Sequence, residues 1–158
     1  MKKTQKKLGN KGFSLVELIV VIAIMAVLVG VLAPTLIRNV EKSRESTDLQ
    51  TLDSLRGSVT TALSTETVNG KLPTGGATLT LGSGTLSGAT GVDADFVTAV
   101  STELSNDGVL TAAMKSKSGQ SGTVTIDIAA DGRVTVSVKG ADGGVVEAAR
   151  SKVNLEVK

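Results

Sequence analysis

Residues 13–37 read FSLVELIVVIAIMAVLVGVLAPTLI, and this stretch decides the fold because its only charge is at Glu17. From Leu18 to Ile37 the chain has 20 successive uncharged residues. As an α-helix such a run is about 30 Å long, which matches the hydrocarbon core of a bilayer. The sequence therefore predicts a membrane-spanning helix near the N-terminus.

A basic leader, MKKTQKKLGNKG (residues 1–12), precedes this segment. It holds five of the 17 basic residues, whereas the chain from Phe13 onward has 12 basic and 15 acidic residues. The net charge of +2 thus comes from the leader, and the composition does not indicate a nucleic-acid-binding domain. Basic residues before an apolar span, with fewer directly after it, predict an amino end in the cytoplasm.

The ordinary alternative for such an N-terminus is a removable signal peptide. That signal needs an apolar core of about 7–15 residues followed by a cleavage site of small residues. The apolar run here is longer, and Ala33-Pro34-Thr35 is a poor site. These features favour a retained membrane helix.

The composition argues against an enzyme. The chain has no Cys, His, Trp or Tyr, and its only aromatic residues are Phe13 and Phe96. Disulfides, thiolate or imidazole metal sites, Cys or His nucleophiles and a histidine general base are therefore excluded. We expect no catalytic residues, no cofactor and no small-molecule substrate.

Glu17 needs an explanation, because a carboxylate inside an apolar membrane helix costs about 2.5–3.5 kcal/mol. In one interpretation it lies near the membrane interface, four residues after Phe13. In the other interpretation its carboxylate pairs with a cation that forms later. Cleavage between Gly12 and Phe13 would create an α-ammonium, which Glu17 of the same chain or of a neighbour could neutralise.

The stretch Lys11–Leu18, KGFSLVEL, resembles the processing site of type IV prepilins and pseudopilins. The resemblance extends over about residues 7–65. It implies that a prepilin peptidase cleaves after Gly12 and methylates the new N-terminus at Phe13, and that Glu17 supports subunit assembly. It also places Pro34 where these proteins commonly carry a helix-breaking proline.

Gly30 and Pro34 are predicted to interrupt the N-terminal helix. A proline removes a backbone donor and clashes with the carbonyl four residues earlier, which here belongs to Gly30. The interruption is either a tolerated kink or a segment that unwinds when subunits leave the lipid. The resemblance favours the second interpretation.

Beyond the membrane the helix is expected to continue to about Thr65. Its segment Arg38–Glu45 has mixed charge, and we expect Glu41 and Glu45 on a solvated surface. An apolar stripe at helical spacing then runs from Leu49 to Leu63 and needs a partner surface. A soluble coiled coil is the alternative, but the first half of the helix is apolar all round.

The rest of the chain predicts a small α+β head. Residues 70–91 are rich in Gly and Thr and predict a loop with a short strand at Thr78–Leu81. A helix over Val92–Leu104, with Asp93 as its N-cap, follows. Further strands are predicted at 109–115 and, near the C-terminus, at Val153–Val157.

The clearest β signal is a hairpin. Residues 123–128 alternate between Thr or Asp and Val or Ile, Asp131-Gly132 supplies the turn, and valines alternate from Val134 to Val138. We expect the Val and Ile face to pack on the helix and the Thr, Asp and Ser face to lie in water.

The predicted fold class is α+β, with the lollipop form of pilins: a long N-terminal helix packed on a small antiparallel sheet. Four parts are expected: a leader (1–12), the transmembrane and assembly half of the helix (13–37), its amphipathic half (38–66) and the head (67–158). The resemblance also raises a calcium site, since major pseudopilins carry one. The acidic residues Asp127, Asp131, Asp142 and Glu147 lack EF-hand spacing, however, so no metal is expected.

The function predicted by the resemblance is that of a type IV pilin, a structural subunit of an extracellular helical filament. The alternatives are a pseudopilin of a type II secretion or competence machine, or a single-pass membrane protein with an exported binding head. The implied partners are other copies of the chain, minor pilins, prepilin peptidase, the membrane-embedded assembly machinery and, before assembly, the bilayer. The precursor is expected in the cytoplasmic membrane and the filament at the cell surface.

Overall fold

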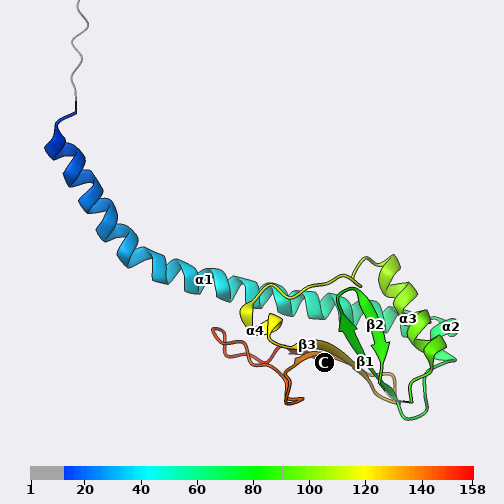
Figure 1. Cartoon of the computed structure of the whole chain (residues 1–158). Helices are drawn as coiled ribbons and strands as arrows, with labels where there is room; N and C mark the ends of the chain where they lie inside the picture. The colour runs from blue at the N-terminus through cyan, green and yellow to red at the C-terminus, as the bar shows by residue number, and fades with distance from the viewer. Residues whose placement is uncertain (1–12, 90) are drawn as a thin grey trace, which may run out of the picture. The chain divides into compact units, whose positions relative to one another are not determined.

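A computed structural model describes residues 13–89 and 91–158 of the chain. They divide into two compact units, which meet between Ile37 and Arg38. Along the chain the elements are α1 (Leu15–Leu63), α2 (Glu66–Asn69), β1 (Ala77–Gly82), β2 (Thr85–Gly88), α3 (Ala94–Asn106), α4 (Lys117–Gln120), β3 (Thr123–Ile128), β4 (Val134–Lys139) and β5 (Glu156–Val157) (Figure 1). The predicted α+β class, a long N-terminal helix with an antiparallel sheet, is confirmed.

In the first unit, the described residues consist almost entirely of the start of α1. An 18-residue window of this helix has a mean hydropathy of 3.1, and none of it is buried. By length and composition this is the one described helix that could cross a membrane. Leucine, isoleucine and valine side chains cover it on all sides, so it has no polar face to turn toward water.

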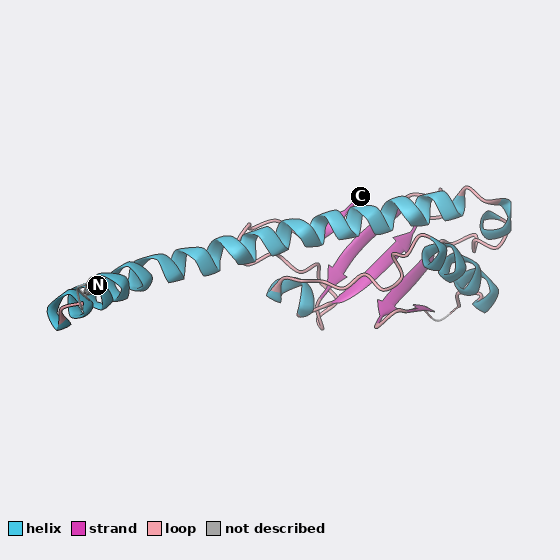
Figure 2. Ribbon diagram, turned by 90° about the horizontal axis from the view of Figure 1, so that it is seen from above, coloured by secondary structure: helices cyan, strands magenta, loops and turns pink. Residues whose placement is uncertain are grey.

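In the second unit, the strands, drawn in magenta in Figure 2, form one antiparallel sheet, whose order is β2-β1-β3-β4-β5. The predicted β3–β4 hairpin is present, with Ile126 opposite Val136. Its turn places Gly132 at φ +83°, where a glycine is favoured, and Asp131 accepts a hydrogen bond from the Arg133 N–H.

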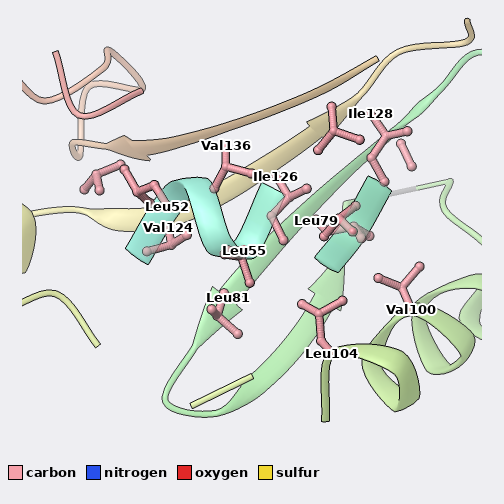
Figure 3. Close-up of a cluster of buried hydrophobic side chains, with 14 of the residues drawn as sticks. Leu52, Leu55, Leu79, Leu81, Val100, Leu104, Val124, Ile126, Ile128 and Val136 are labelled. Atoms are coloured by element: carbon pink, nitrogen blue, oxygen red, sulfur yellow. The ribbon is translucent and has the colours of Figure 1, made fainter. Parts of the chain in front are cut away.

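The core lies between the sheet, the second half of α1 and α3. Leu52 and Leu55 of α1 are fully buried and lie beside Leu79, Ile126 and Val136 of the sheet (Figure 3). From α3 the core takes Phe96, Val100 and Leu104, also fully buried. Each such side chain contributes about 1.5–3 kcal/mol by leaving water, so packing rather than helix propensity holds this part of α1.

The predicted N-cap of α3 is confirmed, since the Asp93 carboxylate accepts from the Asp95 N–H at 2.8 Å. The prediction of a strand at 109–115 was wrong. This segment is made of turns and irregular backbone, because its N–H groups donate to acceptors outside the sheet: those of Val109 and Leu110 to the Leu104 carbonyl, and that of Lys115 to Asp48 of α1.

The polar face of the hairpin is less solvated than expected, because Thr125 and Ser137 are buried. These two residues are paired across β3 and β4. Lys139, on β4, forms an ion pair with Asp127, on β3, in which Nζ lies 2.7 Å from Oδ2. By the strand register, this ion pair passes over the Thr125–Ser137 pair and shields its small side chains from water.

Candidate functional site

The side chain of Glu17 caps the N-terminus of α1. The Ser14 N–H donates to Glu17 Oε2 at 2.9 Å, and the helix begins at the next residue, Leu15. Ser14-Leu15-Val16-Glu17 has the spacing of a capping box, in which the Glu at the third helical position satisfies the N–H of the N-cap residue. Our sequence reasoning missed this capping contact, although the S-x-x-E spacing signals it.

The same geometry brings Glu17 to the predicted processing point. Gly12 lies outside the described residues, and Phe13 is 89% exposed. Phe13 directly precedes Ser14, whose N–H the Glu17 carboxylate accepts. An α-ammonium at Phe13 would therefore form one residue away from a carboxylate that already faces the start of the helix.

Gly30 and Pro34 do not break the helix in this structure, contrary to the expected interruption. α1 is helical without a gap from Leu15 to Leu63, with Pro34 inside it. A proline costs the helix one donor, but the turns on either side keep their hydrogen bonds. Unwinding of this segment in a filament stays a prediction.

Three carboxylates of α1 form a second polar site, which we name the carboxylate clasp: Glu41, Glu45 and Asp48. They follow one another at helical spacing on one face of α1 and accept from backbone N–H groups of two distant loops. Glu41 Oε1 accepts from the Lys117 N–H at 2.5 Å. Glu45 accepts from the N–H groups of Arg150 at 2.9 Å and Ser151 at 2.7 Å.

Asp48 has the most contacts of the clasp. Its two oxygens accept from the N–H groups of Lys115 at 2.7 Å and Ser116 at 2.9 Å, and the Ser116 hydroxyl donates to it as well. The Ser116 Oγ in turn accepts from the Gly119 N–H and caps α4. The clasp thereby fixes both the start of α4 and the C-terminal loop to α1.

The clasp corrects the expectation that Glu41 and Glu45 lie on a solvated surface. Glu45 and Asp48 are fully buried, and the Glu41 side chain is only 13% exposed. Burial by itself raises the pKa of Glu45. The hydrogen bonds from Arg150 and Ser151 and the positive charge of Arg150 lower it by more than burial raises it, so the pKa of Glu45 lies below its ordinary value. The sequence pattern could not reveal this site, because its donors lie more than 60 residues away in the chain.

The four acidic residues that were considered for a calcium site have hydrogen-bond or ion-pair partners within the second unit. Asp127 accepts from the Thr78 hydroxyl and pairs with Lys139, while Asp131 pairs with Arg133. Asp142 accepts from the Gly144 N–H, and Glu147 pairs with Lys152. Within residues 13–89 and 91–158 there is no group of three or more acidic, His or Cys side chains placed to hold a metal ion.

Comparison with known proteins identifies the N-terminal segment. Residues 7–33 match the family model of the prokaryotic N-terminal methylation motif. This motif is the hallmark of the type IV prepilin and pseudopilin family, so the chain carries the N-terminus of a pilin-type precursor. No curated protein and no solved structure matches the chain.

Proposed function

We propose that this chain is a type IV pilin, a structural subunit that is cleaved after Gly12, methylated at Phe13 and assembled into an extracellular helical filament through α1. The observation that carries the proposal is the methylation motif at residues 7–33, which overlaps the apolar, membrane-length first half of α1. The chain is a substrate of prepilin peptidase rather than a catalyst.

The apolar half of α1 needs two different environments in this function. The large apolar side chains from Leu15 to Ile37 are between 45% and 73% exposed in the isolated chain. In the precursor, lipid surrounds them, and the hydrocarbon thickness matches the length of the helix. In the filament, the same side chains pack against those of other copies, because such a surface is not stable in water.

Glu17 acts in the second of these environments. After cleavage, its carboxylate neutralises the α-ammonium of Phe13, in the same subunit or in a neighbour. Charges that are buried in a fibre core of low dielectric attract strongly and are costly when unpaired. The capping contact to Ser14 supports this role, because it holds the carboxylate toward the N-terminal end of the helix.

The first test is the mass of the membrane-bound chain. A mature chain that begins at Phe13 and carries one added methyl group supports the proposal, and an intact Met1 terminus contradicts it. Replacement of Gly12 by Val should block cleavage, because a side chain hinders the close approach of the peptidase. The Gly12→Val chain should then keep its twelve-residue leader.

The second test separates a pilin from the pseudopilin alternative. Cells that express the chain at its natural level should shed long filaments, and mass spectrometry of sheared fibres should find this chain as a main component. Absence of such fibres, with normal cleavage after Gly12, would favour a subunit of a short secretion or competence fibre.

A further inference from the structure

Basic side chains gather at the end of the second unit where the chain arrives from the apolar segment. We name this group the basic collar: Arg38, Lys42, Arg44, Lys115, Lys117, Arg150 and Lys152. All seven are exposed. The carboxylates that accept hydrogen bonds from these residues or form ion pairs with them are Glu41, Glu45, Asp48 and Glu147, of which Glu45 and Asp48 are fully buried. The remainder of this unit holds five basic and ten acidic residues, so the collar is its positive end.

The carboxylate clasp assembles this collar. Each clasp residue accepts from the backbone N–H of a basic residue: Glu41 from Lys117, Glu45 from Arg150 and Asp48 from Lys115. The clasp thus uses the main chain of these residues and leaves their side-chain cations free. Within the described residues, Lys115, Lys117 and Arg150 form no ion pair, and neither do Arg38 and Lys42.

The collar begins at the level of lipid headgroups in a membrane-inserted chain. Arg38 follows Ile37, the last residue of the apolar run. The headgroup layer is about 5–7 Å thick on each side of the hydrocarbon core, and five helical residues rise about 7.5 Å. Arg38 therefore falls in this layer, and Lys42 lies at its outer edge. Lys117, bound to Glu41, lies near the same level, within about one Debye length of the phosphates.

We propose that the basic collar binds the phosphate groups of anionic phospholipids on the surface of the membrane that the precursor spans. The inference rests on the proposed membrane-inserted precursor. It adds a second anchor, which holds this end of the second unit at the bilayer until the subunit is extracted. The acidic remainder of another copy is the competing partner, but an inserted chain already holds its collar against the lipid surface.

The origin of the collar is compatible with the predicted orientation of the membrane helix. Orientation follows the basic residues within about 15–20 positions of a span. Lys115, Lys117 and Arg150 lie far beyond that distance in the chain and join the collar only when the second unit folds. The five leader lysines thus still outnumber Arg38, Lys42 and Arg44 during insertion.

The test uses the full precursor in vesicles and one fluorescent label. The chain has no cysteine, so Ala149→Cys supplies a single labelling point beside Arg150, and Ser105→Cys supplies one on α3. Vesicles contain phosphatidylcholine alone or an equal mixture with phosphatidylglycerol, plus a lipid whose headgroup carries a quencher. We expect the label at position 149 to be quenched several-fold more in the anionic vesicles, and the label at position 105 to be unaffected.

Charge variants then assign the effect to the collar. One basic residue near an anionic surface favours the bound state about fivefold. Lys115→Gln, Lys117→Gln and Arg150→Gln together should thus lower the ratio of surface-bound to free collar at least about tenfold. A matched variant with Lys71→Gln, Arg133→Gln and Lys158→Gln removes the same charge elsewhere and should leave this ratio unchanged. If the collar variant does not fold, Lys115→Gln with Lys117→Gln replaces it.

Several results would overturn the inference. Equal quenching at position 149 in the two kinds of vesicle is one, and quenching that persists at about 1 M salt, where the Debye length is about 3 Å, is another. Quenching that falls as protein density rises, and falls further in the matched variant because its remainder is more acidic, would assign the collar to another copy of the chain. A label introduced by Val21→Cys reports insertion separately. If a quencher on the acyl chains does not reach it, the membrane-inserted precursor itself is contradicted.

Discussion

Glu45 accepts a hydrogen bond from the N–H of Arg150 at 2.9 Å, although the two residues lie 105 positions apart in the chain. Glu45 is fully buried on α1, and its other oxygen accepts from Ser151 at 2.7 Å. The contact fastens the C-terminal loop to the helix that enters the second unit. It also leaves the Arg150 side chain exposed.

We expect Glu45→Ala to destabilise the second unit by at least about 2 kcal/mol. The substitution leaves two backbone N–H groups without their acceptor in a partly buried place, and each loss costs about 1–3 kcal/mol. The measurement is the free energy of unfolding of the full chain in detergent, followed by circular dichroism. Ser46→Ala, on the exposed neighbour, is the control and should change it by less than about 0.5 kcal/mol. Equal stability of both variants would mean that the clasp contributes little.

The contribution of Glu45 should depend on pH. The pKa of Glu45 is lowered in the folded chain from its ordinary value of 4.5, so the unfolded state binds more protons as the pH falls. The stabilisation is therefore complete above about pH 4.5 and is lost as the pH drops through the folded-state pKa. We expect the difference in melting temperature between the native chain and Glu45→Gln to shrink over this range. A constant difference down to strongly acid pH would contradict the assignment.

Gly119→Ala should destabilise the clasp by about 1–3 kcal/mol, as overpacking of a tight core does. A Cβ at this position would lie 2.5 Å from Asp48 Oδ2 and 2.7 Å from the Met114 Cβ, so α4 would have to move away from α1. Gly82→Ala is the matched control, because a Cβ there meets no atom within 4 Å. Thermal unfolding of the two variants measures the difference, and the expectation fails if they melt together.

Replacement of Glu17 should separate its two roles. Glu17→Gln keeps an oxygen that can accept from the Ser14 N–H but loses the charge, whereas Glu17→Val loses both. Since the cleavage point is unchanged, we expect normal processing in both variants and a steep loss of assembled fibres in both. Glu17→Asp keeps the charge on a shorter side chain and should be intermediate. The fraction of mature chain in sheared fibres is the measurement.

The result for Glu17→Gln is decisive. An unpaired buried ammonium costs several kcal/mol, and the amide cannot neutralise it. Fibre recovery at the level of the native chain would reduce Glu17 to a helix cap. Recovery in Glu17→Val as well would mean that the carboxylate has no part in assembly.

Pro34→Ala should restore one backbone donor within α1 and stiffen the membrane helix without preventing insertion. If the segment from Gly30 to Pro34 must unwind for subunits to pack, fibres of this variant should be fewer or less extensible. Fibre yield and extension under force are the measurements. Unchanged values in both would show that Pro34 is tolerated and has no role in the filament.

Much of the chain's organisation was readable from local patterns. The apolar run after Glu17 predicted the membrane-length part of α1, and alternation around Asp131-Gly132 predicted the β3–β4 hairpin. Asp93 announced α3. In each case the signal and the structure that it forms lie within a few residues of each other, because helix periodicity, strand alternation, caps and turns are local properties of the backbone.

The sequence by itself thus determined the N-terminal motif, the membrane-length helix and the α+β class. The tertiary structure alone decided that Glu45 and Asp48 are buried, that Thr125 and Ser137 lie beneath the Lys139–Asp127 pair, and that Lys115, Lys117 and Arg150 join Arg38 in one collar. The mixed charges at 38–45 have the same local pattern whether water or a folded loop covers them. Their partners are selected by long-range packing, and no local spacing records which distant N–H group a carboxylate accepts.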